Sequence, residues 1–152
     1  MKLSELIEKY GDCEVTDELM EMLKPKGDWK PKNGEKYYFI ISSLEIIYET
    51  YVNAETDNNR LSKRNCYKTE EEAQFALDMY NFCKERSFEP DWGDENQCKY
   101  YLYLDCKYKE INYMFDNNLN HFKPFYYPTA EAVNEVINKY SFDELAKYYG
   151  RV

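Results

Sequence analysis

The side chains best suited to metal binding or acid–base chemistry are few in this sequence. His121 is the only histidine, and the five cysteines form no Cys-x-x-Cys pair. Zinc sites built from histidine and cysteine, and paired-histidine sites for other metals, therefore lack the ligands they need. An odd number of scattered cysteines favours reduced thiols over a disulfide framework. We predict no bound metal and no cofactor, and we interpret the cysteines as small buried side chains: Cys13, Cys66, Cys83, Cys98 and Cys106.

Carboxylates are the next candidates for chemistry. Glu70, Glu71 and Glu72 stand together, but glutamates are also what the first turn of a helix favours. The stretches DNNR at 57–60 and DNN at 116–118 carry oxygen ligands, and we interpret both as polar loops rather than metal sites. Phosphate-binding loops, nucleophile elbows and zinc-protease motifs do not occur, and the chain has only five glycines. The sequence therefore predicts a protein that is not an enzyme.

The charge of the chain restricts the kinds of partner it can bind. The net charge is -9 and the pI is about 4.8, which argues against nonspecific binding to nucleic acid. Two interpretations stay open: a solvated surface that keeps the protein soluble, or an acidic face for a basic partner. In the second case, acidic residues near the amino terminus set the association rate and Trp92 anchors the complex. These candidate partner-binding residues are Glu14, Asp17, Glu18, Glu21 and Trp92.

Tyrosine is abundant, with seventeen residues, and it serves both protein cores and binding faces. Alternation along a strand directs one tyrosine of each pair, 37–38 and 100–101, outward. With Tyr126 and one of the pair 148–149, these side chains would form an aromatic surface for a protein or a nucleotide base. The alternative, which we favour, is that they are half-buried strand residues covered by loops.

The elements that position these residues are repeated. YKTEEEAQFALDMY at 67–80 and YYPTAEAVNEVINKY at 126–140 match at a shift of sixty positions. Thr69 and Thr129 become helix N-caps, and the matched apolar residues follow the spacing of one helical face. We expect both faces in a common core: Ala73, Ala76, Leu77 and Tyr80 in the first copy, and Val133, Val136, Ile137 and Tyr140 in the second.

Upstream of each helix lies a predicted hairpin. KYYFIISSLEIIYETY from Lys36 matches KYYLYLDCKYKEINYM from Lys99, sixty-three positions later, with turns at 42–43 and 105–106. The repeated unit is therefore strand, strand, helix. We predict an α+β fold in which two ββα units, about 28–90 and 91–152, pack as one domain of antiparallel sheet and helices.

Helical segments flank the repeats. Residues 1–27 are predicted to form an amino-terminal helical segment, with helices at 4–10 and from Thr16 to Pro25. SFDE from Ser141 has capping-box spacing, which predicts a last helix ended by Gly150. No apolar run approaches the length of a membrane span, and charge appears early in the chain, so we expect a cytoplasmic location.

The sequence carries the pattern Trp29-x-Pro31-x-x-Gly34-x-x-Tyr37-Tyr38, followed by Asn65, Tyr67 and Thr69-x-Glu71-Glu72-Ala73. This pattern resembles a module found in small accessory proteins of bacteriophages and prophages of Gram-positive bacteria. The resemblance covers about 28–83, with an Arg60-bearing polar loop inside it, and the opening MKLSELIEKYGDCEVTDELM looks similar too. The usual Gly or Asp-Gly hairpin turn is replaced by Ser42-Ser43, and the second copy keeps only the Tyr-Tyr and Thr-x-Glu landmarks. The resemblance implies a phage context without a defined activity.

Three functions fit these observations. The first is a phage-encoded, non-enzymatic binding protein that inhibits a host protein, most concretely an anti-CRISPR or other anti-defence inhibitor. Its partner would be a basic protein that handles nucleic acid, met in the cytoplasm of an infected bacterium, with no direct nucleic-acid or membrane binding. The second is a sponge that sequesters a signalling nucleotide. The third is an enzyme of unrecognised type, which would need a pocket with a perturbed carboxylate or His121.

Overall fold

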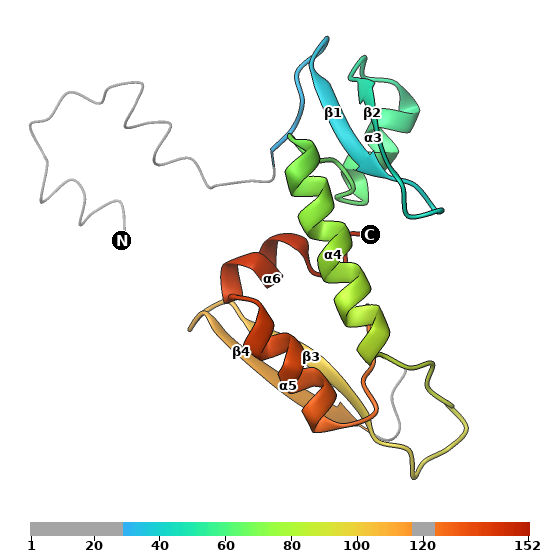
Figure 1. The fold of residues 1–152 in the computed structure, drawn as a ribbon, viewed down its shortest axis with the longest axis vertical. Helices are drawn as coiled ribbons and strands as arrows, with labels where there is room; N and C mark the ends of the chain where they lie inside the picture. Colours follow the sequence, from blue (N-terminus) through green and yellow to red (C-terminus); the bar gives the residue numbers. More distant parts are fainter. Residues whose placement is uncertain (1–28, 117–123) are drawn as a thin grey trace, which may run out of the picture.

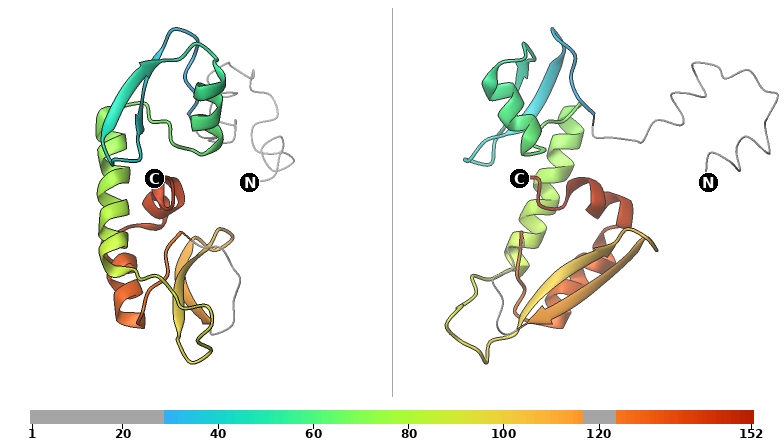
Figure 2. Two further views of the ribbon diagram at one scale, coloured as in Figure 1. Left: turned by 90° about the vertical axis from the view of Figure 1, so that its right-hand side faces the viewer. Right: turned by 180° about the vertical axis from the view of Figure 1, so that it is seen from behind.

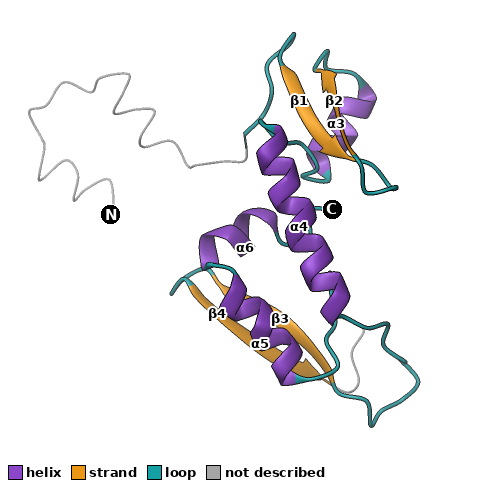
Figure 3. Ribbon diagram, viewed as in Figure 1, coloured by secondary structure: helices purple, strands orange, loops and turns teal. Residues whose placement is uncertain are grey.

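The computed structural model describes residues 29–116 and 124–152, which form an α+β fold (Figures 1 and 3). This confirms the predicted fold class. The predicted helices at 4–10 and 16–25 lie outside the described residues. Within those residues, no helix is long and apolar enough to cross a membrane. In chain order the elements are β1 (Lys36–Ile40), β2 (Ile46–Thr50), α3 (Glu55–Ser62), α4 (Glu70–Arg86), β3 (Lys99–Asp105), β4 (Glu110–Asp116), α5 (Ala130–Lys139) and α6 (Phe142–Tyr148).

The four strands form two separate two-stranded antiparallel sheets, one in each unit. In the first, Tyr38 lies opposite Tyr48, and in the second, Tyr100 lies opposite Phe115. The hairpins lie toward opposite ends of α4, with α6 between them (Figures 1 and 2). The sheets therefore do not join, and helices make the connection between the two units.

A short bridge extends each hairpin on its inner side. Tyr38 and Tyr67 exchange two backbone hydrogen bonds of 2.9 and 2.8 Å, and Tyr100 and Tyr127 exchange two of 3.1 and 2.8 Å. In both units the bridging residue comes just before the helix that follows. Each unit is thus a hairpin, a single bridge residue and a helix, which is why the repeat is visible in the sequence.

The bridges correct the predicted register of the repeat. Tyr38 corresponds to Tyr100, a shift of sixty-two positions, whereas the matching KYY letters predicted sixty-three. Burial agrees with the bridges, because Tyr37 and Lys99 are both buried while Tyr38 and Tyr100 are both half-buried. Side chains alternate between the two faces of a strand, so a shift of one residue exchanges the faces. The shared letters therefore mislead, since Lys99 occupies the place of Tyr37.

The turns lie close to the predicted positions. The first hairpin turns through Ser42 and Ser43, and Leu44 takes a φ of 63°. In the second, Asp105 is the last strand residue, and its carboxylate accepts hydrogen bonds from the backbone N–H groups of Lys107 and Tyr108. An aspartate that bonds backbone two and three residues ahead fixes a tight turn without glycine.

The long helices begin at the predicted N-caps. The hydroxyl of Thr69 accepts the N–H of Glu72, and the hydroxyl of Thr129 accepts the N–H of Ala132, each at 3.2 Å. Such caps satisfy backbone donors that have no partner within the helix. Ser141 and Glu144 form the predicted capping box of α6, with reciprocal bonds of 3.2 and 2.8 Å.

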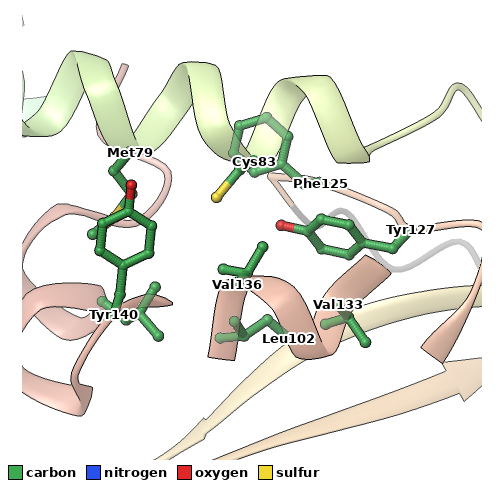
Figure 4. Packing of buried hydrophobic residues seen from close by; sticks show 9 residues of the cluster. Met79, Cys83, Leu102, Phe125, Tyr127, Val133, Val136 and Tyr140 are labelled. Carbon is green, nitrogen blue, oxygen red and sulfur yellow. The ribbon is translucent and has the colours of Figure 1, made fainter. Parts of the chain in front are cut away.

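The apolar faces of the helices are buried, but in different clusters. The first half of α4 packs on the first hairpin, where Ala73, Ala76 and Leu77 meet Ile40 and Tyr67. One or two turns later, α4 contributes Met79 and Cys83 to a second cluster (Figure 4). That cluster also contains Leu102, Phe125, Tyr127, Val133, Val136, Tyr140 and Leu145. The predicted common core is therefore wrong for Ala73, Ala76 and Leu77, whereas Tyr80 does pack against the cluster of the α5 face. Helix α4 runs from one cluster to the other, and Tyr148 packs against both.

The carboxyl-terminal turn is tightly fitted. Gly150 has a φ of 75°, and a Cβ on it would lie 2.7 Å from Cγ of Pro124. Gly34 has a similar φ of 84°, but a Cβ there would meet no atom within 4 Å. The two glycines share the same backbone requirement and differ in the space around them.

These glycines provide a matched test of packing at the carboxyl terminus. We expect Gly34→Ala to lower the free energy of unfolding by about 1–2 kcal/mol, from backbone conformation alone. Gly150→Ala should cost about 1–3 kcal/mol more, because it adds a steric overlap to the same backbone cost. Urea denaturation of both variants measures the difference, and equal costs would contradict the close contact with Pro124.

Candidate protein-binding surface

A buried polar cluster fastens α3 to the first hairpin. The carboxylate of Asp57, 2% exposed, accepts the hydroxyl of Tyr37 at 2.6 Å and the backbone N–H groups of Val52 and Ala54 at 3.0 Å each. Asp57 therefore closes the first turn of α3 and also holds the side chain of a strand residue. The segment predicted as a polar loop at 57–60 is in fact a helix.

Arg60 completes this cluster from the next turn of α3. Its Nη1 donates to the Tyr37 hydroxyl at 2.6 Å and to the carboxylate of Glu49 at 2.5 Å, and its guanidinium lies 3.6 Å from the centre of the Phe39 ring. Desolvation by burial, and then the bond to Asp57, raise the pKa of Tyr37 to about 12. The bond from Tyr37 is the largest cause that lowers the pKa of Asp57. The tyrosine stays protonated and the carboxylate stays charged at neutral pH, so the cluster is suited to fastening rather than proton transfer.

The second unit has a different residue at the equivalent position. Lys99, 1% exposed, occupies the place of Tyr37 and donates from Nζ to the carbonyl oxygens of Asp94 and Gln97 at 3.1 and 3.0 Å. The lysine therefore holds the loop between α4 and β3. Trp92 belongs to the same loop, and its ring centre lies 5.7 Å from Nζ.

Trp92 is the one predicted partner-binding residue that the structure describes. It is 50% exposed, and its ring stands edge-on to that of Tyr126, with centroids 5.1 Å apart. The indole of Trp92 thus packs against Tyr126, in the segment that precedes α5, and stays partly accessible to solvent. The other four predicted residues, Glu14, Asp17, Glu18 and Glu21, lie outside the described residues, as does His121.

The predicted tyrosine surface is largely buried. Tyr37 is 0%, Tyr101 7% and Tyr126 8% exposed, and the other members are half-buried: Tyr38, Tyr100, Tyr148 and Tyr149. The favoured alternative of half-buried strand residues describes Tyr38 and Tyr100, whereas Tyr37 and Tyr101 are buried strand residues and Tyr126 lies outside the strands. Of the cysteines, Cys66 and Cys83 are buried as predicted, and burial raises the pKa of both thiols to about 11. Cys98 is half-buried and Cys106 is exposed.

Three exposed aromatic side chains, Tyr48, Tyr113 and Phe115, lie on the outer strands, and sequence reasoning missed them. Tyr48 on β2 is 62% exposed, and Phe115 on β4 is 61% exposed. Each lies opposite a bridging tyrosine: the centroids of Tyr48 and Tyr38 are 6.1 Å apart, and those of Phe115 and Tyr100 are 5.6 Å apart. The two units therefore present the same aromatic pair at equivalent positions.

The backbone of the outer strands is also available at these positions. Tyr38 and Tyr100 direct their N–H and C=O groups inward to Tyr67 and Tyr127, so they form non-hydrogen-bonded pairs with Tyr48 and Phe115. The backbone groups of Tyr48 and Phe115 must then point to the outer edge. No described residue pairs with that edge in either hairpin.

The two edges differ in how they are covered. Nζ of Lys36 lies 3.7 Å from the centre of the Tyr48 ring and 4.9 Å from that of Tyr38. Cys98 corresponds to Lys36 in the second unit, so no lysine covers the aromatic pair from that position. Two neighbours of Phe115 are also accessible, since Tyr113 is 38% and Met114 49% exposed. The outer edge of the second hairpin is thus the more open apolar surface.

Comparison with known protein families, curated proteins and solved structures finds no match to this chain. Within the described ranges, no group of three histidine, cysteine, aspartate or glutamate residues is placed to hold a metal ion. The phage resemblance remains a prediction. The fold and the accessible strand edges are therefore the basis for assigning a function.

Proposed function

We propose that this chain is a non-enzymatic protein that binds another protein through the outer strand of its second hairpin. The observation that carries the proposal is the exposed aromatic residue, Tyr48 or Phe115, found at the equivalent edge position of both units. An exposed aromatic side chain beside unpaired backbone groups offers both apolar area and hydrogen bonds to a partner. The same arrangement occurs in two units whose residues differ elsewhere, which favours a role for it in binding.

The charge of the chain favours a basic partner. A net charge of -9 attracts a positive surface and speeds encounter, and the effect weakens as salt screens it. Together with the phage resemblance, this supports an inhibitor of a host protein, with a nucleic-acid-handling defence component as the most concrete target. Such an inhibitor needs a complementary surface and no catalytic group.

The proposal is tested by capturing host proteins with immobilised wild-type protein and two variants. Phe115→Ser removes the edge aromatic, while Tyr108→Ser removes an equally exposed residue, 63% against 61%, from the hairpin turn. We expect one basic host protein to be retained by wild type and Tyr108→Ser, and to be lost with Phe115→Ser or at high salt. Retention by all three proteins, or a thermal shift caused by a cyclic nucleotide instead of a protein, would contradict the proposal.

A further inference from the structure

The register of the second hairpin identifies which backbone groups of β4 face outward. The backbone of Tyr100 bonds inward to Tyr127, so Tyr100 and Phe115 form a non-hydrogen-bonded pair. Because such pairs alternate along the strand, Tyr113 and Ile111 also form non-hydrogen-bonded pairs with β3. The N–H and C=O groups of these three residues therefore point away from β3. Resting on the proposed function, we propose that β4 receives an extended, basic segment of the partner protein as an added β-strand.

The edge of β4 lacks the features that usually prevent strand addition. Natural edge strands carry an inward lysine, a proline or a bulge, or they are very short. β4 has seven residues, EINYMFD, without lysine or proline, and its pairing with β3 runs without a bulge from Glu110 to Asp116. By contrast, β2 has five residues, and Lys36 covers its exposed tyrosine. The second hairpin is therefore the more accessible template for a new strand.

Charge distinguishes between two possible sources of the added strand, a basic segment of a partner protein and a second copy of this chain. β4 begins and ends with an acidic residue and contains no basic one, and the whole chain carries a charge of -9. A second copy of this chain, paired about Tyr113, would set Glu110 opposite Asp116 and bring together two chains of the same charge. Like charges opposite each other destabilise a strand pair, whereas lysine or arginine there would stabilise it. A basic segment with alternating apolar residues fits the edge, and a second copy does not.

A backbone-specific variant tests this assignment. Tyr113→Pro removes an N–H group that points outward and does not bond to β3. Proline is tolerated at such edge positions, so we expect the hairpin to be retained. Tyr113→Val removes the same phenol and keeps the N–H, which makes it the matched control. The probe is a peptide selected from a displayed library of short random sequences against wild-type protein, then synthesised for affinity measurement.

We expect the selected peptides to alternate apolar with lysine or arginine residues. Their affinity should fall roughly tenfold or more with Tyr113→Pro and little with Tyr113→Val. Amide exchange gives an independent measurement in the wild-type protein: the amides of Ile111, Tyr113 and Phe115 exchange rapidly alone and slowly with peptide, while those of Asn112 and Met114 are protected in both states. This second measurement holds even if the proline variant does not fold.

Several outcomes would overturn the assignment: no enriched peptide, acidic peptides, equal affinity for the proline variant, unchanged exchange at the three amides, or a dimer of the protein itself formed through β4. The result is separable from the proposed function. If the host protein is lost with Phe115→Ser but kept with Tyr113→Pro, the surface binds the partner through side chains and no strand is added.

Discussion

Asp57→Ala is expected to lower the free energy of unfolding by about 3–5 kcal/mol, because it leaves a buried hydroxyl and two backbone N–H groups without their acceptor. The carboxylate binds Tyr37, Val52 and Ala54, so its loss weakens both the start of α3 and the attachment of α3 to β1. Asn59→Ala is the matched control, since Asn59 lies exposed on the same helix. Urea denaturation measures both variants, and similar small losses would contradict a structural role for the cluster.

The pH dependence of this effect has a definite sign. Because the pKa of Asp57 is lower in the folded protein, the carboxylate stabilises the fold above its unfolded pKa of about 3.9. That contribution is lost as the pH falls through the lower, folded value. The stability gap between wild type and Asp57→Asn should therefore stay constant from neutral pH to about pH 4 and shrink below it. A gap that widens in acid would show that the aspartate is not held as the charged form.

Leu145→Ala is expected to lower the free energy of unfolding by about 2–5 kcal/mol, through lost burial and the cavity left behind. Leu145 is 1% exposed and is the residue of α6 that enters the second cluster. Ile137→Ala removes the same number of carbon atoms from a half-buried site on the rim of that cluster, so it should cost less. Denaturant midpoints at unchanged m-value give both numbers. A smaller loss for Leu145 than for Ile137 would show that α6 is only loosely attached.

Local signals allowed much of the fold to be predicted. Thr69, Thr129 and Ser141 are caps that act within one helical turn, and apolar spacing along α4 and α5 reports a buried face. Helix α3 was missed because its sequence, ETDNNRLS, is polar and its N-cap, Ala54, has no capping side chain. What stabilises α3 is a bond between Asp57 and Tyr37, twenty residues apart. Such long-range partners leave no periodic pattern in the sequence.

The candidate surface was less predictable than the fold. In each KYY stretch one tyrosine is buried and the other half-buried, and the buried one is the first in β1 but the second in β3. The bridges to Tyr67 and Tyr127 set this difference, and the shared letters do not reveal it. Tyr48, Tyr113 and Phe115 lie on β2 and β4, and the strand order that places these strands at the edges is not visible in any local residue pattern. The acidic residues proposed at the amino terminus remain a prediction from composition.

Helix α4 contributes residues to both clusters, and this limits how far the chain can be shortened. Its first half supplies Ala73 and Ala76 to one unit and its second half supplies Met79 and Cys83 to the other. Deleting the second unit would expose the half of this helix that carries Met79 and Cys83, and deleting the first unit would remove the helix that lines part of the second cluster. The two units are therefore not modular. Equivalent positions can carry different buried residues, as Tyr37 and Lys99 illustrate, but neither unit has a complete core without the other.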